Sequence, residues 1–201
     1  MELQLDSLKI LNNIMKAVLR STACMLALIG SLAATSAPQP SASNASKSFE
    51  FMGNMTIKIL LAGADTGGSS ALLEVRVPPN TGPVPHIHTR EDEVYVIKQG
   101  TFQFFMDGTC IQAGPGATVY MPKGHMHAWK NISEQTGEQL MFVYPAGLEQ
   151  FFQEVQELGL KMPKDFDKMN ELSNKKYGIN YVPGYDFHAD QCNVNAVPFG
   201  R

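Results

Sequence analysis

Two histidines and three acidic residues lie close together in one short stretch of the sequence, PHIHTREDEVYVIKQG, residues 85–100. His86 and His88 are separated by one residue, so on a β-strand both rings point to the same face. Imidazole nitrogens and a carboxylate oxygen are ligands that divalent transition metals accept. The stretch is therefore either part of a metal site or a polar strand in which two histidines happen to be close.

Glu93 is the acidic residue of this stretch that we expect to face inward. At strict alternation it would face away from His88, but the polar segment TRED between them can turn or bulge. Glu93 would then share a face with Tyr95 and Ile97, which are residues of the core type. An isolated inward carboxylate is costly, and a nearby cation or metal removes that cost.

A second pair of histidines, His125 and His127, follows the Pro122–Gly124 turn in GATVYMPKGHMHAWKN. Four of the five histidines of the chain thus fall into two pairs. Neighbouring strands of a small barrel would bring the two pairs opposite each other. This clustering favours a metal site, and its mixed nitrogen and oxygen donors suit Fe, Mn, Ni, Co, Cu or Zn without choosing among them.

The fold that must position these side chains is indicated to be all-β. Short runs rich in β-branched and aromatic residues recur at roughly one turn per ten residues, each closed by Gly or Pro. These runs are TIKILLAG, ALLEVRVPP, DEVYVIKQG, TFQFFMDG, ATVYMPKG and EQLMFVYPAG. The spacing favours a sandwich or a small barrel over alternating strands and helices.

The pattern changes to helical spacing after residue 147. Apolar residues spaced as on one helix face predict an amphipathic helix from Leu148 to Leu158, ended by Gly159. A second helix is predicted from Pro163 to the stop at Gly178. We expect both helices to cover an edge or one end of the β core.

The two histidine segments resemble the two sequence motifs of the cupin superfamily, G-x5-H-x-H-x3–4-E-x6-G and G-x5-P-x-G-x2-H-x3-N. His86-x-His88-x4-Glu93-x6-Gly100 matches the core of the first, and Gly116-x5-Pro122-x-Gly124-x2-His127-x3-Asn131 matches the second throughout. Asn80 stands where the first motif has its leading Gly. Asn is the residue other than Gly that best tolerates a left-handed turn, so the fold is not put in doubt.

The resemblance covers roughly residues 55 to 145 and implies a cupin β-barrel, also called a double-stranded β-helix or jelly roll. Carried over position by position, it implies the metal ligands His86, His88, Glu93 and His127, and structural roles for Gly100, Gly116, Pro122, Gly124 and Asn131. His125 lies outside the family's ligand set. It could lie behind the ligands, face the substrate or lie on the surface.

The phrases LAGADTGGSSALLEVRVPP and YPAGLEQFFQEV extend the resemblance to small single-domain bacterial cupins grouped with quercetin dioxygenases. This implies a metal-dependent dioxygenase acting with O2 on a small enolic or phenolic, flavonol-like substrate, with Glu93 as the catalytic base. Candidate cavity walls, of which only some can face inward, are Tyr95, Phe102, Phe104, Met106, Met121, Trp129 and Phe142. Two alternatives stay open: a non-oxidative, isomerase-type cupin and a non-catalytic small-molecule-binding cupin.

The N-terminal stretch is typical of a secretory signal peptide. Lys16 and Arg20 precede an apolar run from Cys24 to Leu32, and small residues follow up to a cleavage zone near Ala37. The run is too short for a stable membrane span. We expect a secreted or periplasmic protein, or a cytoplasmic one if this segment is not cleaved. Because residues 1–14 make an unusually long leading segment, translation could also begin at Met15.

The expected organisation is a signal peptide at 1–37, a linker at 38–47, a cupin barrel at 48–146 and a C-terminal helical extension at 147–201. A formal charge of −3 over 201 residues, with no basic block, gives no reason to expect a nucleic-acid partner. A homodimer is a family expectation. A disulfide between Cys110 and Cys192 would require an oxidising compartment, and a second metal site at His188 is disfavoured.

Overall fold

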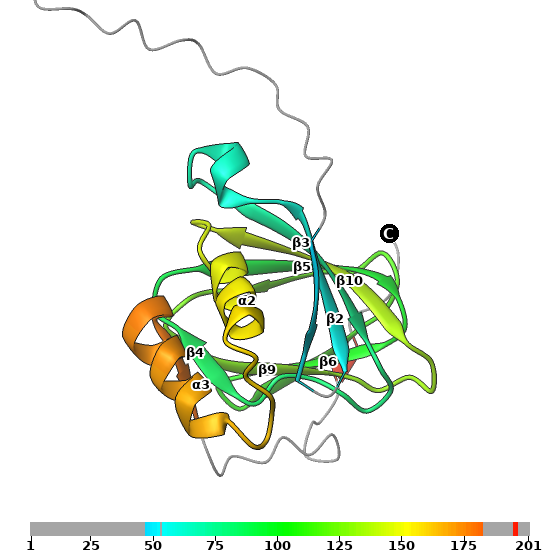
Figure 1. The fold of residues 1–201 in the computed structure, drawn as a ribbon. Helices are drawn as coiled ribbons and strands as arrows, with labels where there is room; N and C mark the ends of the chain where they lie inside the picture. The colour runs from blue at the N-terminus through cyan, green and yellow to red at the C-terminus, as the bar shows by residue number, and fades with distance from the viewer. Residues whose placement is uncertain (1–46, 53, 183–194, 197–201) are drawn as a thin grey trace, which may run out of the picture. The chain divides into compact units, whose positions relative to one another are not determined.

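The computed structural model describes residues 47–52, 54–182 and 195–196 (Figure 1). Its strands form two sheets, and the first sheet contains most of the expected β runs. Six strands form this sheet in the order β1-β2-β3-β10-β5-β8, with antiparallel neighbours. Their bounds are Ser48–Phe51 for β1, Met55–Leu61 for β2, Ala71–Val77 for β3, Asp92–Gln99 for β5, Thr118–Met121 for β8 and Gly137–Tyr144 for β10.

The second sheet has the order β11-β4-β9-β6-β7-β12, and all its neighbours are antiparallel except β12 and β7. Its strands are β4 (His86–His88), β6 (Phe102–Met106), β7 (Thr109–Ala113), β9 (Met126–Asn131), β11 (Ile179–Tyr181) and β12 (Asn195–Ala196). From β3 to β10 the chain passes repeatedly between the two sheets, as in a jelly roll. The predicted cupin-type β fold is confirmed.

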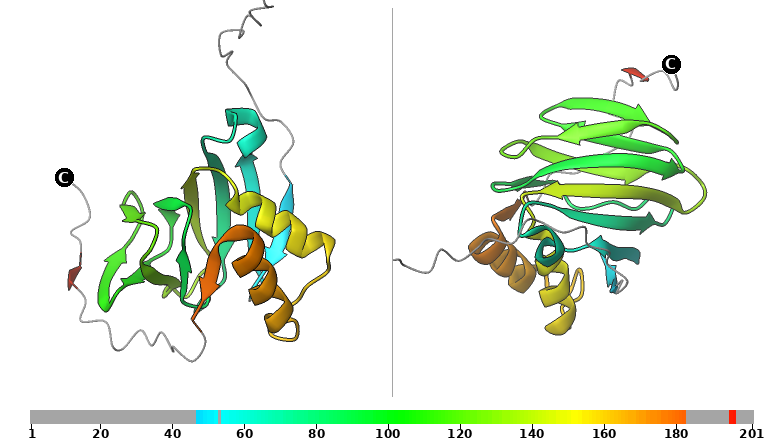
Figure 2. Two further views of the ribbon diagram at one scale, coloured as in Figure 1. Left: turned by 90° about the vertical axis from the view of Figure 1, so that its left-hand side faces the viewer. Right: turned by 90° about the horizontal axis from the view of Figure 1, so that it is seen from above.

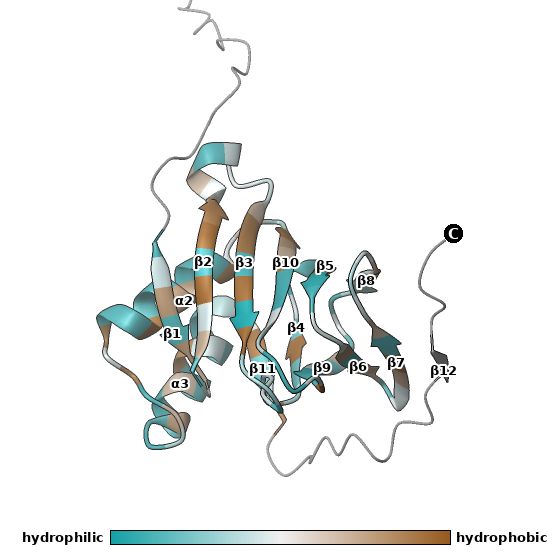
Figure 3. Cartoon of the chain, turned by 90° about the vertical axis from the view of Figure 1, so that its right-hand side faces the viewer, coloured by the Kyte–Doolittle hydropathy of each residue, from teal (hydrophilic) through white to brown (hydrophobic). Residues whose placement is uncertain are grey.

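The core lies between the two sheets and follows from the alternation of side chains along the strands. β2, β3, β5 and β10 bury every second residue, which is the pattern of strands with one face on a core. Figure 3 shows the many hydrophobic residues, in brown, along β2 and β3. Leu73 and Tyr95 from the first sheet and Phe104 from the second are each at most 1% exposed. Each such side chain contributes about 1.5–3 kcal/mol by its burial.

Two helical segments lie at one end of the sheets (Figure 2). α2 spans Leu148–Glu157 and buries four residues of the predicted stripe, Leu148, Phe151, Phe152 and Val155. Leu158, predicted as its last residue, lies just after the helix and is 58% exposed. The second helix is shorter than predicted: α3 spans Phe166–Leu172 and continues as a π-helical turn, Ser173–Tyr177. It ends at Gly178, whose φ of +71° lies in the left-handed region.

The chain after the helices returns to the second sheet, which the sequence does not predict. β11 pairs with β4, so the helical extension also supplies the edge strand beside the first histidine pair. A short 3-10 helix, η2 (Gly63–Thr66), lies between β2 and β3. Gly63 N and Gly147 N both donate to the buried carboxylate of Glu149, at 3.1 and 2.8 Å, which fixes the start of α2 against η2.

The described residues belong to one compact unit, residues 41–201. The predicted signal peptide, Cys192, His188 and most of the linker lie outside the described residues, so the domain boundaries stay predictions. In the part of the chain that the structure describes, no helix has the length and apolar character needed to span a bilayer.

Several turn residues of the two motifs have the conformation that their positions require. Gly100, Gly116 and Gly124 have φ values between +83° and +88°, and Asn80 has a φ of +56° in place of the family glycine. Asn131 is fully buried, and its side-chain amide donates to the carbonyls of Val77 and Gln135 at 2.9 and 2.8 Å. These residues aim the strands that carry the candidate ligands.

Candidate metal centre

The structure brings His86, His88, Glu93 and His127 together in the interior. One donor atom from each of the four lies within 4.8 Å of the others, and their exposed fractions are between 0 and 6%. His86 and His88 lie on β4, and His127 lies on β9 directly opposite His86 in the antiparallel register. Glu93 comes from β5, so the cluster joins the second sheet to the first.

A bend between β4 and β5 explains how Glu93 reaches the cluster. Residues 89–91 belong to no strand, and after them β5 buries Glu93, Tyr95 and Ile97 on one face. The chain therefore changes sheet within a few residues, and this change resets the alternation, as the polar TRED segment led us to expect.

The outward nitrogen of each clustered histidine faces a hydrogen-bond acceptor. Nδ1 of His86 lies 2.7 Å from the carbonyl of Val84, and Nδ1 of His127 lies 3.0 Å from the carbonyl of His125. Nδ1 of His88 lies 3.3 Å from Oε2 of Glu91. Because a carbonyl only accepts, Nδ1 of His86 and of His127 must carry a proton, and in a neutral ring Nε2 is then a free electron-pair donor.

The inward nitrogens are poorly satisfied by the protein alone, and this fits a metal ion. His127 Nε2 is buried and makes no hydrogen bond of acceptable geometry to the described residues, although Glu93 Oε2 is 3.1 Å away. His88 Nε2 lies 3.6 Å from Glu93 Oε1. A buried acceptor without a partner destabilises by about 1–3 kcal/mol. Together with the rings of His86 and His88 and the Glu93 carboxylate, this nitrogen completes a donor set for one divalent transition metal.

The electrostatics of the cluster favour an ionised Glu93. Burial would raise the pKa of Glu93, but the adjacent rings of His88 and His127 outweigh it and hold the pKa well below its usual range. Burial, together with repulsion from His127 and His88, lowers the pKa of His86 well below 6.5. Burial also lowers the pKa of His88, but Glu93 and Glu91 outweigh that effect and leave it raised.

Glu93 is held in place by a chain of hydrogen bonds. Tyr95 Oη donates to Glu93 Oε2 at 2.9 Å, and Trp129 Nε1 donates to Tyr95 Oη at 3.0 Å. All three side chains are at most 5% exposed. Burial and the Glu93 carboxylate raise the pKa of Tyr95 well above 10, so its hydroxyl stays a donor. The chain leaves Glu93 Oε1 as the oxygen without such a donor.

Glu91 belongs to the site, although the sequence analysis did not assign it a role there. It is 3% exposed and contacts Nδ1 of His88, which places it behind a candidate ligand. Its only sequence signal is an acid three residues after a histidine, and such pairs are common on surfaces. Asp92, by contrast, accepts from the backbone N of Lys123 at 2.8 Å and lies away from the cluster.

His125 lies on the surface, which is one of the three positions that the sequence left open for it. Its side chain is 49% exposed, and its Nδ1 pairs with Asp107 Oδ2 at 2.5 Å. The backbone carbonyl of His125, and not its ring, supports the cluster by accepting from His127.

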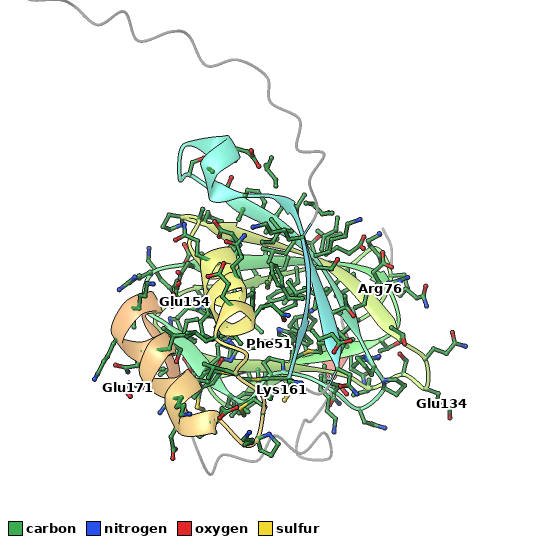
Figure 4. The ribbon with its side chains drawn as sticks, viewed as in Figure 1. Phe51, Arg76, Glu134, Glu154, Lys161 and Glu171 are labelled. Carbon is green, nitrogen blue, oxygen red and sulfur yellow. The ribbon has the colours of Figure 1, made fainter. Side chains whose placement is uncertain are left out.

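A narrow cavity opens beside the cluster. Its walls are formed by Phe51, Met55, Ile57, Val75, Pro83, His86, His88, Glu93, Tyr95, Trp129, Met141, Leu148, Phe151, Phe152, Ile179 and Tyr181. It offers about 40 Å³ to the centres of water-sized molecules, which is room for roughly three waters. Figure 4 places Phe51 beside α2, and its ring packs edge-on against Phe151 and Phe152 at 5.9 and 4.9 Å between centroids.

The predicted wall residues are only partly correct. Tyr95 and Trp129 line the cavity. Phe102, Phe104 and Met121 are buried elsewhere in the core, Met106 is partly buried against it, and Phe142 is 38% exposed on the outer face of β10. The prediction for Phe142 is wrong because side chains alternate between the two faces of β10, and Met141 and Val143 take the inward positions.

Comparisons with known proteins find a family match for part of the chain. Residues 73–143 match the family model described as Cupin domain. Similar solved structures include the KdgF protein of a Halomonas species, with 18% identity and a TM-score of 0.47 over 52% of this chain and 92% of that one. A predicted oxalate decarboxylase of Thermotoga maritima has 18% identity and a TM-score of 0.48 over 53% and 99%.

An RmlC-like cupin of Shewanella frigidimarina has 15% identity and a TM-score of 0.46 over 57% of this chain and 96% of its own. At these identities the similarities carry no argument about activity. No curated protein sequence matches this chain. The match to the Cupin domain model covers residues 73–143, and none of these similarities indicates the chemistry of the site.

Proposed function

We propose that this cupin-domain protein is a metal-dependent dioxygenase that acts on a small, largely apolar enol or phenol. The observation that carries the proposal is the buried cluster of three histidines and Glu93 at the wall of an apolar cavity. A bound divalent transition metal (Fe, Mn, Ni, Co, Cu or Zn) would supply Lewis acidity toward a substrate oxygen and, where redox-active, toward O2.

The residues of the chain supply binding and proton transfer. His86, His88, Glu93 and His127 would hold the metal. Glu93 would be one of the residues that hold the metal, and as the buried carboxylate at the cavity wall it is the group that could accept the enol or phenol proton of a substrate. Tyr95 donates to Glu93 Oε2, which leaves Oε1 as the oxygen that would take the proton.

The cavity wall favours an apolar substrate over a sugar. Apart from the cluster itself, the lining residues that the structure describes include only Tyr95, Trp129 and Tyr181 as polar side chains. There is no lysine, arginine, serine, threonine or amide among them to pair with phosphate or several hydroxyls. An isomerase-type reaction on a sugar phosphate would leave those polar groups unsatisfied, so we place it second.

Cavity size bounds the substrate. With room for roughly three waters, the cavity admits a small enol or one phenolic ring, and a flavonol would need Phe51 or α2 to move. We therefore propose that the substrate is a small enol or a phenol with a single ring.

The test is to measure metal content and then O2 uptake by the protein loaded with Fe, Mn, Ni or Co. The substrates are 2,4-pentanedione, catechol and quercetin. Substrate-dependent O2 loss in the wild type and in His125→Ala, but not in His86→Ala, supports the proposal. One bound metal with no O2 uptake on any substrate would contradict it. Isomerisation assays with small ketoses then address the second candidate, and binding without turnover points to the third, a small-molecule-binding module.

We also propose a homodimer through the outer face of the first sheet. Leu72, Phe142, Val94 and Tyr120 follow one another across β3, β10, β5 and β8 in register, and Tyr120 and Phe142 are 53% and 38% exposed. Beside this row Glu74, Lys98, Glu138 and Arg76 carry both signs of charge, as a self-complementary two-fold interface needs. Light scattering on the wild type should give a dimer, and Phe142→Lys should give a monomer with unchanged metal content.

Export remains a proposal that rests on the N-terminal pattern of the sequence alone. The intact mass of the protein purified from fractionated cells tests it. A mature chain that begins near residue 38 in the periplasm or medium supports export, and a chain in the cytoplasm that retains Met1 or Met15 contradicts it.

A further inference from the structure

The hydrogen-bond donors of the cavity wall are almost all committed to the protein. Tyr95 donates to Glu93, Trp129 donates to Tyr95, and the clustered histidines direct Nδ1 to acceptors behind them. Tyr181 is the exception: among the described residues no hydrogen bond to its hydroxyl is present, and burial is the sole cause that raises its pKa. The ring is 9% exposed.

The register of β11 places Tyr181 on the cavity side of the sheet. Tyr181 lies directly opposite His86, and Ile179 lies opposite His88. Side chains of directly opposite residues share a face, and His86 and His88 face the cavity, so Tyr181 faces it too. Its ring centroid is 5.9 Å from that of His86 on one side and 6.0 Å from that of Phe166 on the other.

The position of β11 is fixed by contacts to the bend beside the cluster. Thr89 N and Thr89 Oγ1 both donate to the carbonyl of Gly178 at 2.9 Å, and Val182 N donates to the carbonyl of Pro85 at 2.8 Å. A Cβ at Gly178 would come within 2.4 Å of Thr89 Oγ1, so the approach requires glycine. A strand beyond the matched residues 73–143 is thus held against the cluster.

We propose that the Tyr181 hydroxyl donates a hydrogen bond to a second oxygen of the substrate, and that β11 thereby determines specificity. This inference rests on the proposed function. The ligand class is a small apolar molecule with two nearby oxygens, such as an enolised 1,3-diketone or a catechol. One oxygen is directed to the metal site and the other to Tyr181. A hydrogen bond between a buried hydroxyl and such an oxygen should strengthen binding by about 10- to 100-fold.

The test is anaerobic binding of 2,4-pentanedione to the metal-loaded protein, followed by the fluorescence of Trp129. Trp129 is the single tryptophan of the chain and lines the cavity. Tyr181→Phe keeps the ring contacts and removes only the hydroxyl. We expect one metal per chain in wild type and variant, and a Kd for the probe about 10- to 100-fold higher in the variant. Tyr144→Phe, on β10 and outside the cavity lining, is the matched control and should bind like the wild type.

A Kd in Tyr181→Phe within about twofold of the wild-type value would overturn the inference, and so would a wild type that binds metal but not the probe. A second readout guards against a misfolded variant: probe binding should change the tyrosine ultraviolet absorption of the wild type, and an unchanged spectrum would count against a contact with Tyr181. Because no turnover is needed, probe binding that depends on Tyr181 without any O2 uptake would contradict the dioxygenase proposal alone.

Discussion

At the scale of single residues, the site depends on which atom of each side chain remains free to bind a metal once its other atoms have hydrogen-bonded to the protein. The carbonyls of Val84 and His125 and the carboxylate of Glu91 occupy the outer nitrogens of the three clustered histidines. The inner nitrogens and the carboxylate of Glu93 are then the donors that face one another. Nearby His125, with an equally good imidazole, is not part of the cluster because its ring is exposed and pairs with Asp107.

The first prediction concerns the four clustered side chains. His127→Ala and Glu93→Gln should each lower bound metal from about one equivalent to well below half after dialysis, because each removes one of four donors. Metal content measured by plasma emission spectroscopy checks this. His125→Ala is the control: it removes a histidine two residues away, and its metal content should match that of the wild type. Full occupancy in Glu93→Gln would show that the carboxylate is not a ligand.

The second prediction concerns Glu91. Its contact with Nδ1 of His88 should orient the ring and raise its basicity, so Glu91→Gln should weaken metal binding by about 10- to 100-fold without abolishing it. A competition titration with a chromogenic chelator measures this. Asp92→Asn changes the adjacent acid, which bonds to Lys123 N and not to the cluster. Equal affinities in the two variants would mean that Glu91 does not act through His88.

At the scale of elements, the sequence predicts what repeats along the chain and misses what depends on distant contacts. The β runs, the inward Glu93 and the amphipathic stripe of α2 follow from local periodicity. Tyr181, Phe51 and Phe151 line the cavity only because β11, β1 and α2, which are far apart in the sequence, come together there. Phe142, which lies on the outer face of β10, shows the same limit of sequence-based prediction. When the neighbours of an aromatic residue in a strand are also apolar, the sequence does not show which face of the sheet the side chain lies on.

The third prediction concerns β1 and its contact with α2. Phe51 lines the cavity and also a surface groove of about 390 Å³ between β1 and the segment after α2. Phe51→Ala should join the two spaces and lower the free energy of unfolding by at most about 3 kcal/mol, because the ring is only half-buried. The variant should then bind quercetin, seen as quenching of Trp129, where the wild type does not.

Phe142→Ala, which truncates an exposed phenylalanine on the outer face of β10, is the matched control and should leave quercetin binding unchanged. If the wild type binds quercetin as tightly as Phe51→Ala does, Phe51 does not limit the size of the ligand. If Phe51→Ala binds 2,4-pentanedione but not quercetin, another residue separates the cavity from the groove.

At the scale of the whole molecule, the cluster ties the two sheets together. The histidines come from β4 and β9 of the second sheet, and Glu93 comes from β5 of the first. No hydrogen-bonded strand pairing joins β5 to β4 or β9 among the described strands. A metal ion held by ligands from both sheets would therefore add a strong link where side-chain packing is otherwise the main contact.

The last prediction follows from that link. Metal at 100 times its Kd should stabilise the fold by about 2.7 kcal/mol, which raises the Tm by roughly 5–10 °C for a domain of this size. The pKa of His88 is raised because Glu93 and Glu91 outweigh its burial, so protons compete for this ring already above its usual pKa, and the shift should shrink as the pH falls through that range. Calorimetry at pH 7.5 and 5.5, with and without metal, measures both effects. Glu93→Gln should lose most of the shift at pH 7.5, because it should bind little metal and any metal that stays would be held by one sheet only. A variant that still binds one metal and keeps the full shift would show that the stabilisation arises within the second sheet.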